Sequence, residues 1–128
     1  MKDSLLSTIT SLLLILLISF HLADDVARGY EKGGLANLMA LPILVVWLYG
    51  ALLLRERRSG YVITLLGSLL SLAVPYFHMK GKGLASQVAR SPSGGFFFAW
   101  TIIALGGIGL FSIVLSARGL WRLGRRSQ

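Results

Sequence analysis

The sequence predicts an all-α integral membrane protein, a four-transmembrane-helix up-down-up-down bundle with a short interfacial helix in the third loop. Its hydrophobic fraction of 55% and mean hydropathy of +0.72 are too high for a soluble domain of 128 residues. The apolar residues form four long blocks, and blocks of about 20 residues indicate membrane-spanning helices. The connections between the blocks are short, which favours antiparallel neighbours in a bundle.

We expect a single membrane domain over residues 1–128, with spans at about 4–23, 35–54, 61–77 and 96–117 and a basic cytoplasmic tail at 118–128. The first block follows Lys2, an arrangement that signal peptides share. Its apolar run is long for a signal peptide, and His21-Leu-Ala23 is a poor cleavage site, so we expect a retained helix. Pro42 lies one or two turns into the second block, and Pro75 lies near the end of the third.

The basic residues predict the orientation of the chain. Under the alternating topology, one side carries Lys2, Arg55, Arg57, Arg58, Arg118, Arg122, Arg125 and Arg126, and the other carries Arg28, Lys32, Lys80, Lys82 and Arg90. The first set is larger, and positively charged loops stay in the cytoplasm. We therefore expect a protein of the bacterial inner membrane, with both termini in the cytoplasm.

The third loop and the two membrane boundaries carry their own patterns. Apolar residues recur at helical spacing over 84–90, which predicts a short helix lying in the interface. Aromatic residues favour the boundary between membrane and water. An aromatic collar is predicted at the outer boundary, formed by Phe96, Phe97, Phe98 and Trp100. Trp121 is predicted to anchor the inner boundary.

Small residues recur at helix-facing intervals inside the spans. Such residues let membrane helices approach closely, so these faces are expected to pack the bundle or to dock another subunit. The third and fourth spans contribute Gly67, Ser71, Gly106, Gly109, Ser112 and Ser116, and the first contributes Ser4, Thr8 and Ser11.

Composition excludes several classes of function. The chain has no cysteine, which excludes disulfides, thiolate chemistry and cysteine-based zinc or iron–sulfur sites. No charged residue lies in the middle of a predicted span, which disfavours proton-coupled transport. The basic runs lack interleaved aromatic residues, so we expect no nucleic-acid partner. No catalytic motif is present, and we expect no enzymatic activity.

The polar exit of the first span carries the chemistry that the sequence offers. If the helix continues one turn beyond the membrane, His21 and Asp25 share a face, and Asp24 and Arg28 share another. Asp24–Arg28 is expected to be a structural ion pair. His78, at the end of the third span, is predicted to reach the same outer edge as His21. We therefore take His21, Asp24, Asp25 and His78 as the candidate ligand or metal site.

Four interpretations of this group remain open, and no cofactor is required by the sequence. A divalent metal would take both histidines with one aspartate. A haem would lie between His21 and His78. A quinone or other small molecule would contact His21, Asp25, Tyr76 and His78. In the fourth interpretation the group is only a solvated helix end. For the whole chain we expect a structural or accessory subunit surrounded by lipid. Its partner would be another membrane subunit or a second copy of itself. The alternative function is that of a binding protein or transporter.

Overall fold

The computed structural model describes residues 2–80 and 92–126, which form helices and no strand. The elements are α1 (Lys2–Ala27), the 3-10 helix η1 (Leu35–Met39), α2 (Ala40–Leu52), α3 (Arg58–Lys80) and α5 (Pro92–Arg126). Four segments are long and apolar enough to cross a membrane: α1, η1 with α2, α3 and α5. The interfacial helix expected at 84–90 lies outside the described residues.

The helix ends differ from the expected spans by a few residues, except in α5. The 35-residue α5 begins before position 96 and runs well past position 117. The second segment begins as a 3-10 turn, in which the Gly34 amide donates to Asn37 Oδ1 at 3.0 Å. The α-helix starts at Ala40, which places Pro42 in its first turn. A proline is tolerated there because the first amides of a helix have no partner within it.

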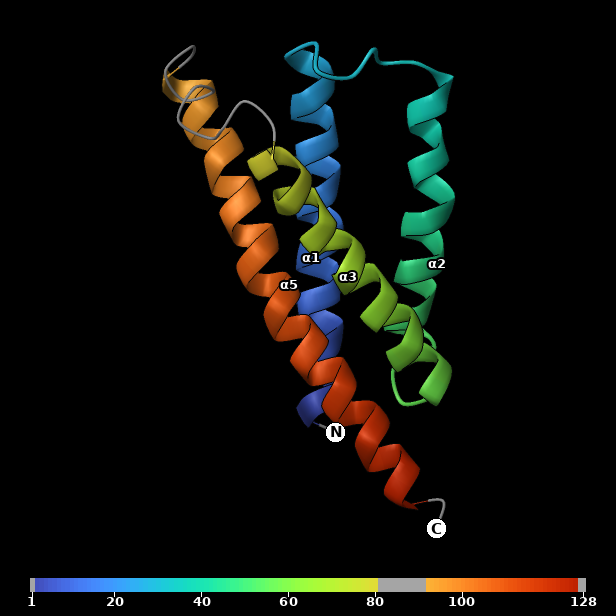
Figure 1. Cartoon of the computed structure of the whole chain (residues 1–128). Coiled ribbons are helices and arrows are strands. Elements are labelled where there is room, and N and C mark those ends of the chain that lie inside the picture. The colour runs from blue at the N-terminus through green and yellow to red at the C-terminus, as the bar shows by residue number, and fades with distance from the viewer. Residues whose placement is uncertain (1, 81–91, 127–128) are drawn as a thin grey trace.

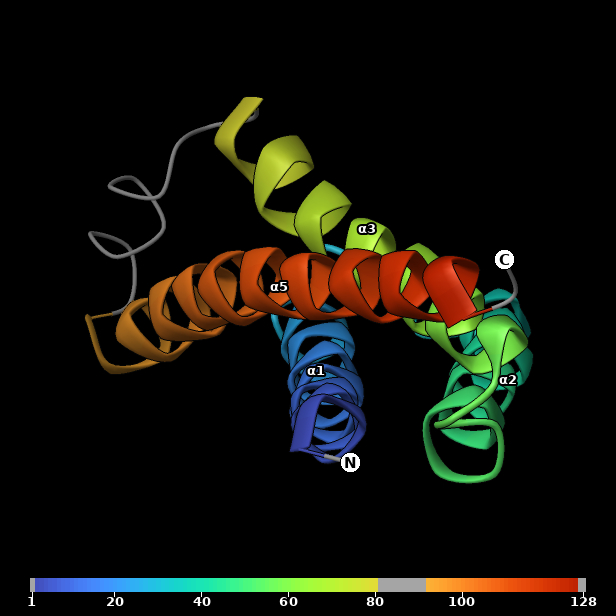
Figure 2. The same cartoon turned by 90° about the horizontal axis from the view of Figure 1, so that it is seen from below.

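The longest helix, α5, organises the packing. It packs most extensively against α3 and then against α1, while α2 packs against α3 and α1. Figure 2 shows α5 lying across the other helices. Figure 1 shows the N- and C-termini at one end of the molecule and the α1–α2 connection at the other. The α2 segment is the most peripheral, since only 17% of its residues are buried against 39% of the apolar window in α5.

The interior combines a small apolar cluster with a seam of hydroxyl groups. Leu14, Trp47 and Leu105 form the apolar cluster and are almost fully buried. The hydroxyls of Ser68 and Ser112 are hydrogen-bonded at 2.7 Å and join α3 to α5. Ser68 and Ser71 donate to the carbonyls of Thr64 and Ser68, whereas the hydroxyls of Ser11 and Ser116 have no hydrogen-bond partner among the described residues. Small side chains of this kind suit helices that approach closely. The fully buried members are Ser11, Ser68, Ser71, Ser112 and Ser116.

The glycines named from the sequence occupy three different environments. Gly67 lies against the indole of Trp47, and a Cβ atom there would collide with the ring. Gly109 lies against α3, where a Cβ atom would come within 2.5 Å of Ser71 Oγ. Gly106 has room, because the nearest atom to an added Cβ is Pro75 Cγ at 3.9 Å. Close approach therefore requires glycine at positions 67 and 109, and not at position 106.

Candidate metal centre

The last turns of α1 position one histidine and two aspartates. The helix continues without interruption to Ala27, and the chain then turns at Gly29, whose φ of 73° is a left-handed conformation that favours glycine. The Tyr30 amide donates to the Asp25 carbonyl at 2.8 Å and closes this end of the helix. His21 and Asp25 therefore lie one turn apart on one face, as the sequence predicted.

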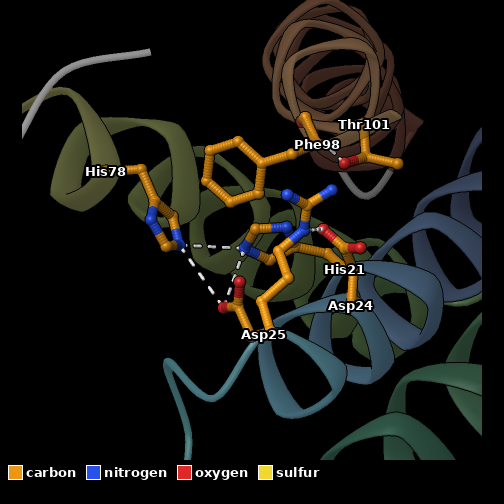
Figure 3. A network of polar contacts seen from close by, with 7 residues as sticks. His21, Asp24, Asp25, His78, Phe98 and Thr101 are labelled. Atoms are coloured by element: carbon orange, nitrogen blue, oxygen red, sulfur yellow. Dashed lines mark hydrogen bonds and ion pairs between the residues drawn. The ribbon is translucent and has the colours of Figure 1, made fainter. Parts of the chain in front are cut away.

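His78 reaches the same point from the last turn of α3. Its Nε2 lies 2.9 Å from Nε2 of His21. The Oδ2 atom of Asp25 lies 3.4 Å from Nε2 of His21 and 3.6 Å from Nε2 of His78. Two imidazole nitrogens and one carboxylate oxygen therefore form a compact triangle, shown with dashed lines in Figure 3. We call His21, Asp25 and His78 the triad.

Asp24 belongs to a different contact. Arg28 Nε donates to Asp24 Oδ2 at 2.7 Å, which is the ion pair expected from their four-residue spacing. In Figure 3 Asp24 lies on the side of α1 away from His78. The two adjacent aspartates thus have separate roles: Asp25 faces the histidines, and Asp24 holds the arginine.

Phe98 covers the triad from α5. Its ring centroid lies 5.5 Å from that of His21 and 5.1 Å from that of His78, and the side chain is 2% exposed. The Arg28 guanidinium carbon is 5.8 Å from the same ring. Figure 3 shows the phenyl ring beside both imidazoles. The site is therefore assembled from three helices, α1, α3 and α5, and one of its walls is apolar.

Phe98 corrects the predicted aromatic collar. Phe96, Phe97 and Trp100 are exposed, but Phe98 points inward. The sequence contains a signal for this, because Phe98, Thr101, Ile102 and Leu105 lie at positions i, i+3, i+4 and i+7 of one helix face, and all four are at most 2% exposed. Aromatic clustering concealed that periodicity.

Burial makes the triad costly unless its polar atoms are satisfied. His21 is 4% exposed and Asp25 is 7% exposed. His21 Nδ1 and Asp25 Oδ1 are also buried, without a hydrogen-bond partner among the described residues. Buried polar groups are normally hydrogen-bonded, and exceptions call for an explanation such as an ion or a water. The triad therefore differs from an ordinary solvated helix end.

One hydrogen bond between the imidazoles does not serve all three contacts of the triangle. An imidazole nitrogen either donates or accepts one hydrogen bond in its ring plane. If one Nε2 donates to the other, the accepting nitrogen has no lone pair and no proton left for the carboxylate. If both Nε2 atoms carry protons, the two N–H groups oppose each other at 2.9 Å. No arrangement of protons gives each of the three contacts its own hydrogen bond.

A metal ion satisfies all three atoms at once. Zinc binds imidazole nitrogen and carboxylate oxygen at about 2.0–2.2 Å, so neighbouring ligands of a tetrahedral site lie about 3.3–3.6 Å apart. The contacts of Asp25 at 3.4 and 3.6 Å already match that separation. The histidine pair, at 2.9 Å, needs to open by about half an ångström. Three protein ligands leave a fourth position for water or a small ligand.

The geometry does not suit the haem interpretation. A haem between two histidines places one imidazole on each face of the porphyrin. The 2.9 Å between the two Nε2 atoms leaves no room for a porphyrin plane, since carbon atoms in contact already need about 3.5 Å. Tyr76, the aromatic residue expected in a small-molecule pocket, is 53% exposed and packs edge-on against Phe77.

Comparison with family models, with curated proteins and with solved structures found no match for this chain.

Proposed function

We propose that this chain is a small integral membrane protein that binds one divalent transition-metal ion, of the zinc type, through His21, Asp25 and His78. The observation that carries the proposal is the triangle of two Nε2 atoms and one Oδ2 atom, which a cation satisfies and protons do not. The donor set of two imidazoles and one carboxylate suits zinc and neighbouring first-row metals. The proposed role is binding, because the sequence carries no catalytic motif.

The proposal includes a membrane placement for the site. We place the four segments across a bacterial inner membrane as an up-down-up-down bundle, with both termini in the cytoplasm. The larger set of basic residues at the terminal end supports this orientation. The triad then faces the non-cytoplasmic side, where it takes up metal from outside the cell.

Metal titration of the purified full-length protein tests the proposal. The protein is stripped with a chelator in detergent and titrated with Zn²⁺ by calorimetry and with Co²⁺ as a spectroscopic probe. We expect one metal per chain and the visible absorption of tetrahedral Co²⁺. His21→Ala and His78→Ala are expected to lose at least about 100-fold in affinity, because losing groups that only orient a metal ligand already costs 10–100-fold.

Glu31→Gln is the matched control, since it removes an exposed carboxylate from the same end of the molecule. It is expected to bind metal as the unaltered protein does. The proposal fails if the double variant His21→Ala/His78→Ala binds Zn²⁺ as tightly as the unaltered protein, or if the unaltered protein does not bind it.

A second candidate is the structural or accessory subunit expected from the sequence. The observation that favours it is the exposure of the segment formed by η1 and α2, of which only 17% of residues are buried. A neighbouring membrane subunit or a second copy would cover that face. The mass of the gently solubilised protein tests this role, and a lone monomer without any co-purifying chain counts against it.

A further inference from the structure

Two exposed tryptophans lie far apart along α5. Trp100 and Trp121 are 61% and 59% exposed, and 21 residues separate them. At 1.5 Å per residue that separation is about 32 Å, close to the thickness of a bilayer core of about 30 Å. Tryptophan favours the interface. In the proposed membrane placement the two rings lie at the two boundaries of the membrane, and Trp121 lies at the boundary on the terminal side.

One face of α5 changes from apolar to basic at this boundary. Five exposed side chains follow one another at intervals of three and four residues, which places them on a single helix face. We call this face the lipid stripe: Phe111, Val114, Arg118, Trp121 and Arg125. The Arg125 guanidinium lies 3.8 Å from the centre of the Trp121 ring, in cation–π contact.

The surroundings of the lipid stripe are also positively charged. Tyr61, near the start of α3, packs so closely on Gly119 that an added Cβ atom would collide with its ring. The start of α3 therefore lies beside the last turns of α5, and it brings the exposed Arg58, with the exposed Arg55 and Arg57 in the turn before it. The carboxylates at this end already have arginine partners: Asp3 pairs with Arg122, and Glu56 pairs with Arg55.

We propose that the lipid stripe holds an anionic phospholipid. The acyl chains lie along Phe111 and Val114, and the phosphodiester accepts hydrogen bonds from Arg118 and Arg125. Along the lipid stripe, apolar side chains give way to tryptophan and arginine. Along a phospholipid, hydrocarbon gives way in the same order to the interface and the phosphate. Charge complementarity favours an anionic headgroup, because basic side chains near such a surface each add attraction. This site does not depend on the metal proposed for the triad.

Lipid retention measured by native mass spectrometry tests the proposal. The full-length protein in detergent is titrated with phosphatidylglycerol and with phosphatidylcholine that carry the same acyl chains. We expect phosphatidylglycerol to be retained preferentially and its binding to weaken as salt is raised. Each arginine is expected to contribute about fivefold, so Arg118→Gln/Arg125→Gln weakens phosphatidylglycerol binding about 25-fold. Arg118→Lys/Arg125→Lys, which keeps the charge, retains most of it.

Two single variants form a matched pair. Arg125→Gln and Lys32→Gln each remove one exposed positive charge, from opposite ends of the molecule. Only Arg125→Gln is expected to weaken binding. Equal retention of the two lipids overturns the proposal, as does phosphatidylglycerol binding that is insensitive to salt or equally weakened by both single variants. Displacement of the lipid by inorganic phosphate also overturns it, because the site would then hold a free anion.

Discussion

The two ends of this bundle use charge in opposite ways. At one end His21 and Asp25 are almost fully buried, and three helices bring the triad together under an aromatic ring. At the other end the arginines are exposed, and the ion pair between Arg55 and Glu56 has both side chains more than half exposed, with 3.9 Å between its charged atoms. Water or lipid headgroups satisfy exposed charges, but they do not reach buried ones.

This difference distinguishes the proposed coordination site at the triad from the charged surface at the opposite end. A buried polar atom without a partner costs about 1–3 kcal/mol, whereas an exposed ion pair contributes about 0–1 kcal/mol. In the proposed function the triad therefore takes a specific metal ligand by coordination, while the proposed lipid site at the basic end selects by charge.

Two adjacent aspartates provide the sharpest test. Asp25→Ala is expected to reduce Zn²⁺ affinity at least about 100-fold, because it removes the carboxylate that contacts both histidines. Asp24→Ala is expected to leave the affinity within about threefold, since Asp24 pairs with Arg28 and not with the triad. Calorimetric titration of both variants measures the contrast. Equal losses would mean that net charge, and not coordination, controls binding.

Metal is expected to stabilise the fold through the triad. A ligand that binds only the native state adds about 2.7 kcal/mol to the free energy of unfolding when its concentration is 100 times its Kd. Denaturation followed by circular dichroism in detergent, with Zn²⁺ and then with excess chelator, measures this gain. His78→Ala is expected to show no gain. A gain of the same size in His78→Ala would place the bound metal elsewhere.

A substitution in the middle of the bundle tests general packing without changing either of the two ends. Gly67→Ala is expected to destabilise the protein by about 1–3 kcal/mol, because the new methyl group collides with the buried indole of Trp47. The metal affinity of the folded fraction is expected to persist, because position 67 lies about three turns before His78 in α3 and its neighbour Trp47 lies in α2, outside the triad. Gly107→Ala, where no atom lies within 4 Å of an added Cβ, is the control. It is expected to be neutral or to stabilise the helix by roughly 0.5–1 kcal/mol.

The smallest effect is expected at the exposed end. Arg122→Ala breaks the ion pair with Asp3 and is expected to cost less than about 1 kcal/mol of unfolding free energy. The cost should shrink further in high salt, because exposed charges are screened. A loss as large as that of Gly67→Ala would show that this end is held as rigidly as the triad.

The sequence predicted the four apolar segments well, because block length and hydropathy report burial in a membrane directly. It predicted the end of α5 poorly. Hydropathy falls after position 117, but arginine and leucine are good helix formers, and the helix continues to Arg126. The start of α2 was also hidden, since the 3-10 turn before it is set by local contacts of Gly34 and Asn37.

The contacts of the candidate site were also predictable only in part. The pairs His21–Asp25 and Asp24–Arg28 follow from helical spacing and were predictable. The contact between His21 and His78 joins residues 57 positions apart and depends on how α1 packs against α3. The sequence placed both histidines at one edge, but helix packing determines whether they touch. Phe98 was missed because its inward face is visible only through the spacing of its neighbours.

The second segment has a further consequence for the bilayer around the protein. Thirteen α-helical residues and five 3-10 residues span about 30 Å in total, so this segment only just crosses a hydrocarbon core. The 35 residues of α5 extend about 52 Å. In the proposed placement the bundle therefore has one short wall and one long wall. Because this segment has no length to spare, lipids next to α2 must thin wherever the bilayer is thicker than about 30 Å, so the protein is expected to tilt there and to favour thinner membranes.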